Sequence, residues 1–150
     1  MNNILQSFTY GLYTLSCGDY ICVVDTAMQV SSVNSDDVYI AVSINKNSDT
    51  GNLIKEGENF AVSVLADYTP KEVVQQLGSG HSSEMNKFKG LEYIMLDGVR
   101  IPYEYCLGTL VCHPVNIIDC GSHNLIIGKV IDYKEFNEDL PLTYQLYKDL

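Results

Sequence analysis

The feature that most limits the fold is a series of short runs rich in aromatic and β-branched residues. Residues 8–16 read FTYGLYTLS and residues 20–24 read YICVV, with a glycine and an aspartate between them, a pattern typical of a β-hairpin. Residues 38–44 (VYIAVSI) and 60–65 (FAVSVL) predict two further strands that are buried on both faces. Strand-like runs this close together favour a sheet of mainly antiparallel strands.

Two longer runs near the C-terminus predict a second hairpin. Residues 107–115 and 124–132 are rich in Leu, Ile and Val, and they flank the turn-forming sequence Asp-Cys-Gly-Ser at 119–122. A tight turn between two such runs predicts a long antiparallel pair.

Helical signals are few and short. Thr69 precedes Pro70, and a glutamate follows three residues after the threonine, which predicts a helix capped by Thr69, begun by Pro70 and ended at Gly78. A shorter helix is expected over residues 50–56, with a further turn over 83–88.

Strands and helices do not alternate along the chain, so a doubly wound parallel sheet is disfavoured. The pattern predicts a mainly β fold, an antiparallel barrel or sandwich with two or three short helices. With 150 residues and no internal linker or repeat, residues 1–150 are expected to form a single domain.

Charge and cysteine content narrow the expected partners and location. Nineteen acidic against nine basic residues give a formal net charge of −10. Nucleic acids and anionic membranes attract proteins through cationic faces, so neither is an expected partner. No apolar run approaches the roughly 20 residues that span a bilayer, and the first residues lack the basic and apolar regions of a secretion signal. The five cysteines are odd in number and form no C-x-x-C pair, so free thiols and a cytoplasmic location are expected.

The segment 43–50 (SINKNSDT) carries the densest set of hydrogen-bonding groups. It leaves an expected strand and enters an expected helix, and it offers hydroxyl groups, amides and one cation, Lys46. A phosphate monoester is held by several directed donors and positive charge, so this segment is a candidate phosphate site. The alternative is a polar strand-to-helix turn in which a Ser or Asp caps the helix.

A second polar stretch, residues 25–32 (DTAMQVSS), interrupts an apolar region. Its Thr, Gln and Ser side chains suit the rim of a flat heteroaromatic ligand, with Ala27 or Met28 packed nearby. The alternative is a loop or edge strand that satisfies its own backbone.

Two other patterns are not interpreted as sites. The sequence GSGHSS at 78–83 follows an expected helix and not a strand, so it is not a dinucleotide loop. The spacing of Cys112, His113, Cys120 and His123 matches no common zinc pattern, and strand alternation places the first two on opposite faces. No metal site and no catalytic side chain is therefore expected.

In order along the chain, YGLYTLS, DTAMQVSS, SINKNSDT, FAVSVL, NKFKGLEY and DCGSHNLIIGKVID resemble the flavin reductase-like, FMN-binding split-barrel family. The resemblance covers residues 10–147 and is greatest to flavoredoxins and to the N-terminal domain of high-molecular-weight rubredoxins. It implies a six-stranded antiparallel Greek-key split barrel that forms a homodimer, with FMN near the dimer interface. It also implies electron transfer from NADH or NADPH to flavin, or from bound FMN to a small redox protein or free flavin.

Matching positions of the family motifs imply a set of FMN contacts. The phosphate stretch corresponds to Ser43, Asn45, Lys46 and Thr50, and the stretch against the ring and ribityl chain corresponds to Asp25, Thr26, Gln29 and Val30. His123 corresponds to the histidine of the family's GSH-type motif.

Three positions depart from the family pattern. Asp25 replaces an asparagine, Gly51 replaces a common histidine, and His81 lies near an expected arginine. Each change removes a contact to an anionic ligand or adds negative charge beside it. The alternative hypothesis is therefore a degenerate split barrel, a non-catalytic flavin-binding or electron-carrier accessory dimer.

Overall fold

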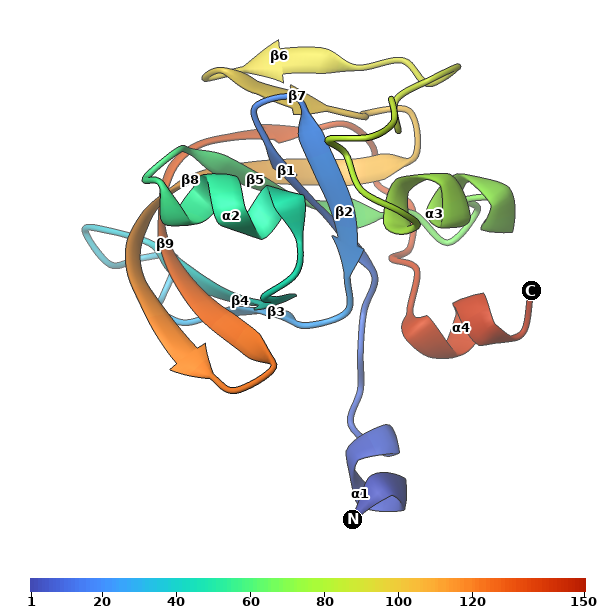
Figure 1. Ribbon diagram of the computed structural model, residues 1–150, viewed down its shortest axis with the longest axis horizontal. Helices are drawn as coiled ribbons and strands as arrows, with labels where there is room; N and C mark the ends of the chain where they lie inside the picture. Colours follow the sequence, from blue (N-terminus) through green and yellow to red (C-terminus); the bar gives the residue numbers. More distant parts are fainter.

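A computed structural model describes all residues, 1–150, and its main feature is one curled antiparallel sheet (Figure 1). The seven strands of this sheet lie in the order β2-β1-β5-β8-β9-β4-β3. Their bounds are β1 Tyr13–Cys17, β2 Tyr20–Val24, β3 Ala27–Gln29, β4 Tyr39–Asn45, β5 Phe60–Leu65, β8 Cys106–Cys120 and β9 His123–Glu135. Strand β4 lies beside β9, the last strand of the β5–β8–β9 series, which is a Greek-key order.

The sheet curls around a core of side chains from one face. Leu15, Val42, Phe60 and Ile126 are buried there, and Ile54 of helix α2 (Asp49–Lys55) joins them. The curl does not close, because β2 and β4 are not hydrogen-bonded to each other. The result is a half-barrel with an open seam between these two strands.

The long β8–β9 hairpin confirms the predicted C-terminal pair and extends it at both ends. Its turn contains Gly121 at φ +84°, a conformation that glycine adopts without strain. Near the middle, a Cβ atom on Gly128 would lie 2.5 Å from the Phe60 ring, so β9 can approach the core only with glycine here. Two register irregularities, at 111–112 and at 114–116 of β8, accompany the bend of the hairpin.

Two expectations about the strands are wrong. The sheet has seven strands and not six, because residues 27–29 pair with β4 as a short edge strand. The first strand begins at Tyr13 and not at Phe8, because its pairing with β2 and β5 starts at Tyr13, opposite Val24 and Val64. Ahead of it lies helix α1 (Asn2–Gln6), which has no buried residue and projects from the barrel in Figure 1.

The two predicted helices are present, but one cap differs. Helix α2 begins as expected, with Ser48 accepting a hydrogen bond from Gly51 N. Helix α3 (Lys71–Gly78) ends at the predicted glycine, but Pro70 and not Thr69 is its N-cap residue, and no side chain caps it. The buried hydroxyl of Thr69 instead donates to Ala66 O at 2.6 Å, because the chain turns sharply out of β5 there. The turn at 83–88 is present, and a further short helix, α4 (Tyr144–Lys148), was not predicted.

A small separate hairpin, β6 (Ile94–Leu96) and β7 (Val99–Ile101), was also missed. Its turn is Asp97-Gly98, both at positive φ, and an Asp-Gly pair between apolar residues is a signal that could have found it. Val99 and Ile101 pack on the outer side of the main sheet. The longest helix in the chain has eight residues, and none is long and apolar enough to cross a bilayer.

Ile54 offers a test of how α2 closes the half-barrel. Its side chain is fully buried, so Ile54→Ala is expected to lower the free energy of unfolding by about 2–5 kcal/mol. Asn52→Ala, on the exposed side of the same helix, should change it by less than about 0.5 kcal/mol. Urea denaturation measures both. Equal small effects would show that α2 is not part of the core.

Candidate functional site

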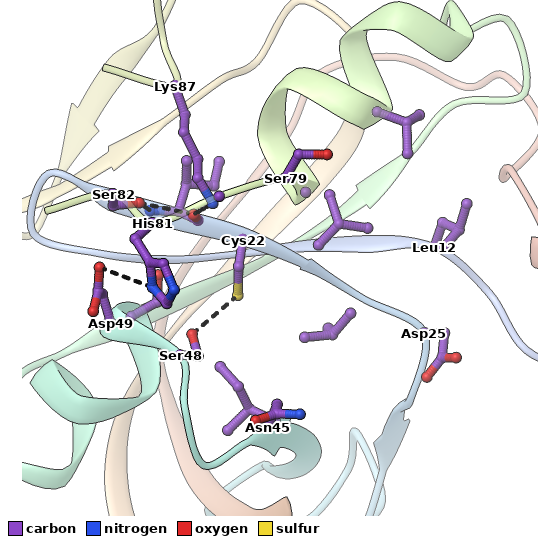
Figure 2. Close-up of a pocket in the computed structure, with 18 of the residues that line it drawn as sticks. Leu12, Cys22, Asp25, Asn45, Ser48, Asp49, Ser79, His81, Ser82 and Lys87 are labelled. Atoms are coloured by element: carbon purple, nitrogen blue, oxygen red, sulfur yellow. Dashed lines mark hydrogen bonds and ion pairs between the residues drawn. The ribbon is translucent and has the colours of Figure 1, made fainter. Parts of the chain in front are cut away.

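The open seam between β2 and β4 holds a cavity of about 580 Å³ (Figure 2). The outer half of β2 and the end of β4 form two of its walls. The start of α2 and the loop after α3 form the others, and Tyr144 and Tyr147 of α4 contribute to its rim. The volume is in the range of small-molecule sites. Residues as far apart in sequence as Leu12 and Tyr147 meet in it because the sheet curls.

Five of the expected contact residues line this cavity: Asp25, Ser43, Asn45, Thr50 and His123. Ser43 and Asn45 lie opposite Leu125 and His123 in the β4–β9 pairing, so the two strands place them side by side. In Figure 2, Asp25 lies at the other end of the cavity from Asp49 and His81.

The other four do not line the cavity. Lys46 pairs with Asp119 at the tip of the β8–β9 hairpin, with 2.6 Å between Nζ and Oδ1. This hydrogen bond, with another from Gly121 N, lowers the pKa of Asp119. Thr26 donates to Asp25, Gln29 donates to Ser31 O, and Val30 is exposed. The stretch 25–32 thus forms an edge strand and loop that satisfies much of its own hydrogen bonding.

Lys87 is the cation that the cavity contains, and sequence reasoning missed it. The residue is only 4% exposed, and its Nζ donates to Ile21 O at 3.0 Å. It makes no ion pair, and two of its three N–H donors have no protein acceptor. Burial lowers the pKa of Lys87, because it disfavours the charged form. The lysine belongs to the NKFKG motif, but nothing in that motif shows that it is buried beside β2.

The loop after α3 is fastened to β2 by Ser82. Ile21 N donates to Ser82 Oγ, and Ser82 Oγ donates to Ile21 O, both at 3.0 Å. These bonds and the Lys87 bond satisfy backbone groups of β2 that face no neighbouring strand. The edge of β2 therefore holds the loop, with its lysine, at the cavity.

A second fastening joins the same loop to the start of α2. Asp49 Oδ2 accepts from Ser83 N at 3.1 Å and from Ser83 Oγ at 2.7 Å. His81 Nδ1 lies 3.4 Å from the same oxygen (Figure 2). The Ser83 hydrogen bonds, more than His81, lower the pKa of Asp49, so this carboxylate is ionised at neutral pH.

Cys22 places a thiol in the wall of the cavity, where it accepts a hydrogen bond from Ser48 at 3.8 Å. Burial is the largest effect on this group and raises the pKa of the Cys22 thiol. It therefore stays protonated at neutral pH, and since the thiolate is the nucleophilic form, Cys22 is not an activated nucleophile. Elsewhere, Cys112 is buried while His113 is exposed, which confirms that they lie on opposite faces.

The protein is thus a curled antiparallel half-barrel with a cavity at its seam, and the cavity contains one buried lysine that makes no ion pair. The Flavin reductase like domain family matches residues 5–148 of the sequence, so the chain belongs to that family. This confirms the resemblance on which the sequence interpretation relied.

Two relatives and one solved structure illustrate the similarity. A high-molecular-weight rubredoxin of Moorella thermoacetica is 36% identical over 149 residues, which are 95% of this chain but only 63% of the rubredoxin. A ferric-chelate reductase (NAD(P)H) of Archaeoglobus fulgidus is 34% identical over 147 residues, covering 93% of this chain and 83% of that protein. The NADH:FAD oxidoreductase of Streptomyces globisporus superposes with a TM-score of 0.80 at 14% identity, over 95% of this chain and 80% of that one. The last likeness shows a shared split-barrel fold.

The buried charge of Lys87 gives a stability prediction. At neutral pH the folded protein bears a buried ammonium without a carboxylate, so Lys87→Met is expected to raise the free energy of unfolding by about 1 kcal/mol. A lowered pKa in the folded state means that the unfolded state binds the proton more tightly. The gain should therefore be largest below the lowered pKa and disappear as pH rises to 10.5, the ordinary lysine value.

Lys89→Met, at an exposed position two residues away, is the matched control and should show no such pH-dependent difference. Denaturant unfolding across this pH range measures both. A decrease of more than about 1 kcal/mol in the free energy of unfolding of Lys87→Met would contradict this prediction. It would show that the hydrogen bond of Lys87 stabilises the fold by more than the burial of its charge destabilises it.

Proposed function

We propose that the seam cavity binds FMN and that the protein is an oxidoreductase that passes electrons from NADH or NADPH through this flavin to free flavin or a small redox protein. The observation that carries the proposal is the buried Lys87 ammonium, which keeps two unused donors in a cavity of about 580 Å³. The names of the Archaeoglobus and Streptomyces proteins, both nicotinamide-dependent reductases, support the donor class.

The side chains present fit such a ligand. Lys87 and the Ser79 hydroxyl, both lining the cavity, would hold the terminal phosphate. Ser43, Asn45 and His123 offer hydrogen bonds to the polar edges of the ring from the other wall. A buried charge–phosphate contact is strong because the surroundings are poor in water.

In the proposed complex the protein binds and orients, and the chemistry belongs to the cofactor. Bound FMN supplies the exchange of electrons with a reduced nicotinamide. Leu12, Val24 and Ile44 give the cavity an apolar side that excludes water from a flat ring. The Cys22 thiol stays protonated, so it adds no charge to the site. No side chain is required to act as a general acid or base.

A specific observation supports the alternative of a flavin-binding accessory without reductase activity. Asp25 and Asp49 both line the cavity, so two carboxylates face one permanent cation, Lys87. A charge-assisted contact is worth roughly 1.5–3 kcal/mol, and added negative charge weakens it. A Cβ atom on Gly51 would lie 3.3 Å from the Ile44 side chain, so a histidine there requires Ile44 to shift slightly. Asp25→Asn, which removes one negative charge, should tighten FMN binding.

The proposal is tested by titrating purified protein with FMN and then adding NADH or NADPH anaerobically. Binding at micromolar FMN is expected, followed by bleaching of the flavin absorbance faster than for free FMN. Binding without faster bleaching would favour the accessory role, and no binding at tens of micromolar FMN would refute the cofactor assignment.

Two lysines give a matched pair of variants for the same titration. Lys87→Met should raise the FMN dissociation constant roughly 10- to 100-fold, the equivalent of one lost charge-assisted contact. Lys46→Met, whose ammonium pairs with Asp119 outside the cavity, should change it less than about twofold. The reverse order of effects would place the phosphate at the strand-to-helix turn instead.

We propose further that the protein is a homodimer joined through the outer face of β3, β4, β8 and β9. Strand pairing places Met28, Ala41, Ile127, Leu125 and Ile118 together on this face. Met28 and Ile118 are 59% and 42% exposed, which is costly for apolar side chains in a monomer. The face runs directly into Ser43 and His123 of the cavity, so a second copy there would border the ligand.

Ile118→Lys is expected to convert the dimer to a monomer, because it places a charge on the proposed apolar face. Val33→Lys, at a 73% exposed apolar side chain in the loop between β3 and β4, is the control and should leave the assembly unchanged. Light scattering coupled to size-exclusion chromatography measures both masses. A wild-type protein that is monomeric at micromolar concentration would contradict the proposal.

A further inference from the structure

We infer that the His81–Asp49 pair makes anion binding in the seam cavity depend on pH, with tighter binding when His81 is protonated. This inference rests on the proposed function, that the cavity holds the phosphate of FMN. It goes beyond that function because it concerns how affinity is controlled. No other pair in the chain joins an imidazole to a carboxylate in the wall of this cavity.

The geometry of the pair supports this control. His81 Nδ1 lies 3.4 Å from Asp49 Oδ2, and both residues line the cavity with Lys87 (Figure 2). His81 belongs to the loop that Ser82 fastens to β2, and Asp49 begins α2. The His81 side chain is half exposed, so it exchanges protons with solvent, and it remains held beside the cavity because both flanking segments are fastened.

The proton changes the net charge of the pair. Ionised Asp49 beside neutral imidazole contributes −1 to the cavity wall, and this charge repels an anion. When His81 binds a proton the pair becomes neutral, and the positive charge of Lys87 is no longer offset on that side. An imidazole is the side chain whose charge changes between about pH 5 and pH 8. Affinity for an anion is therefore expected to rise as pH falls through this range.

Among the charged or titratable groups that line the cavity with His81, the carboxylates, the thiol and the lysine do not supply the same effect. They are Asp49 of α2, Asp25 and Cys22 of the β2 wall, and Lys87 from the chain that follows the loop. Asp49 is already ionised because its pKa is lowered, and the Cys22 thiol stays protonated because its pKa is raised. Glu84, whose backbone N–H donates to His81 O, lies in the same loop and is exposed. His123 lines the cavity too, and its Nδ1 contacts Ser122. A proton on His123 would also add positive charge to the wall, so the experiment includes a His123 variant.

The experiment measures FMN dissociation constants by flavin fluorescence at about pH 6 and about pH 8 for wild type, His81→Gln, His81→Arg and His123→Gln. The phosphate of FMN itself loses negative charge near pH 6, which weakens binding at low pH in every variant. His81→Gln measures this background. The ratio of the FMN dissociation constant at pH 8 to that at pH 6 should be about fivefold larger in the wild type than in His81→Gln.

The variants separate charge from structure. His81→Arg carries a permanent charge, so it should bind FMN more tightly than the wild type at pH 8, and its ratio of the two dissociation constants should equal that of His81→Gln. His123→Gln measures the contribution of the second imidazole in the cavity wall, and its ratio should stay larger than that of His81→Gln. Asp49→Asn, whose amide oxygen can still accept from Ser83, should tighten binding at pH 8 because the repelling charge is gone.

The outcomes distinguish the inference from the function. FMN binding with the same pH ratio in wild type and His81→Gln would overturn the inference and leave the cofactor site intact. A wild-type ratio retained in His81→Arg would overturn it as well. Failure of the wild type to bind FMN at either pH would overturn both.

Discussion

The backbone of Ile21, which is buried but has no strand beside it on one side, is the constraint on which the site depends. Strand β2 is an edge strand, and no strand pairs with it across the seam. Its free N–H and C=O groups are met by the Ser82 hydroxyl and the Lys87 ammonium, which come from a loop more than sixty residues later. Buried backbone groups must find partners, so the requirement of an edge strand draws a charged side chain into the interior. The lysine uses only one of its three N–H donors in this contact, so the other two are free to bind an anion.

The electrostatic balance of the cavity follows from this arrangement. A chain with a net charge of −10 is a poor general partner for anions, so a phosphate is held only where local geometry concentrates positive charge. Lys87 supplies that charge permanently, while His81 supplies it with its proton. Asp49 works against both, but it also fastens the loop through Ser83. One carboxylate thus helps to set both the position of the loop and the charge of the cavity wall, and the proposed coupling of anion binding to proton uptake rests on it.

Most strands were predictable because their signals are local. Residues 20–24 and 60–65 alternate or run apolar within a few positions, and the structure has strands with the same bounds. The Ser48 cap of α2 is local too, and it confirms the alternative in which the 43–50 segment is a capped turn. The prediction that the first strand begins at Phe8 was wrong because the alternation of residues along one strand does not show where its pairing with a neighbouring strand begins. The prediction that Thr69 caps α3 was wrong because its hydroxyl donates to Ala66 O in the preceding turn.

The sequence by itself determined the family and the antiparallel sheet, and it singled out Ser43, Asn45, Thr50 and His123, which the structure brings to one cavity. Only the tertiary structure decided which lysine enters the cavity. Lys46 stands in the richest polar motif, yet Asp119 holds it at the hairpin tip, whereas Lys87 stands in a plain loop and is buried against β2. The position of each ammonium depends on the carboxylate or carbonyl that lies beside it in the folded sheet. These partners are about seventy residues apart in sequence, so strand pairing brings them together and local spacing does not predict them.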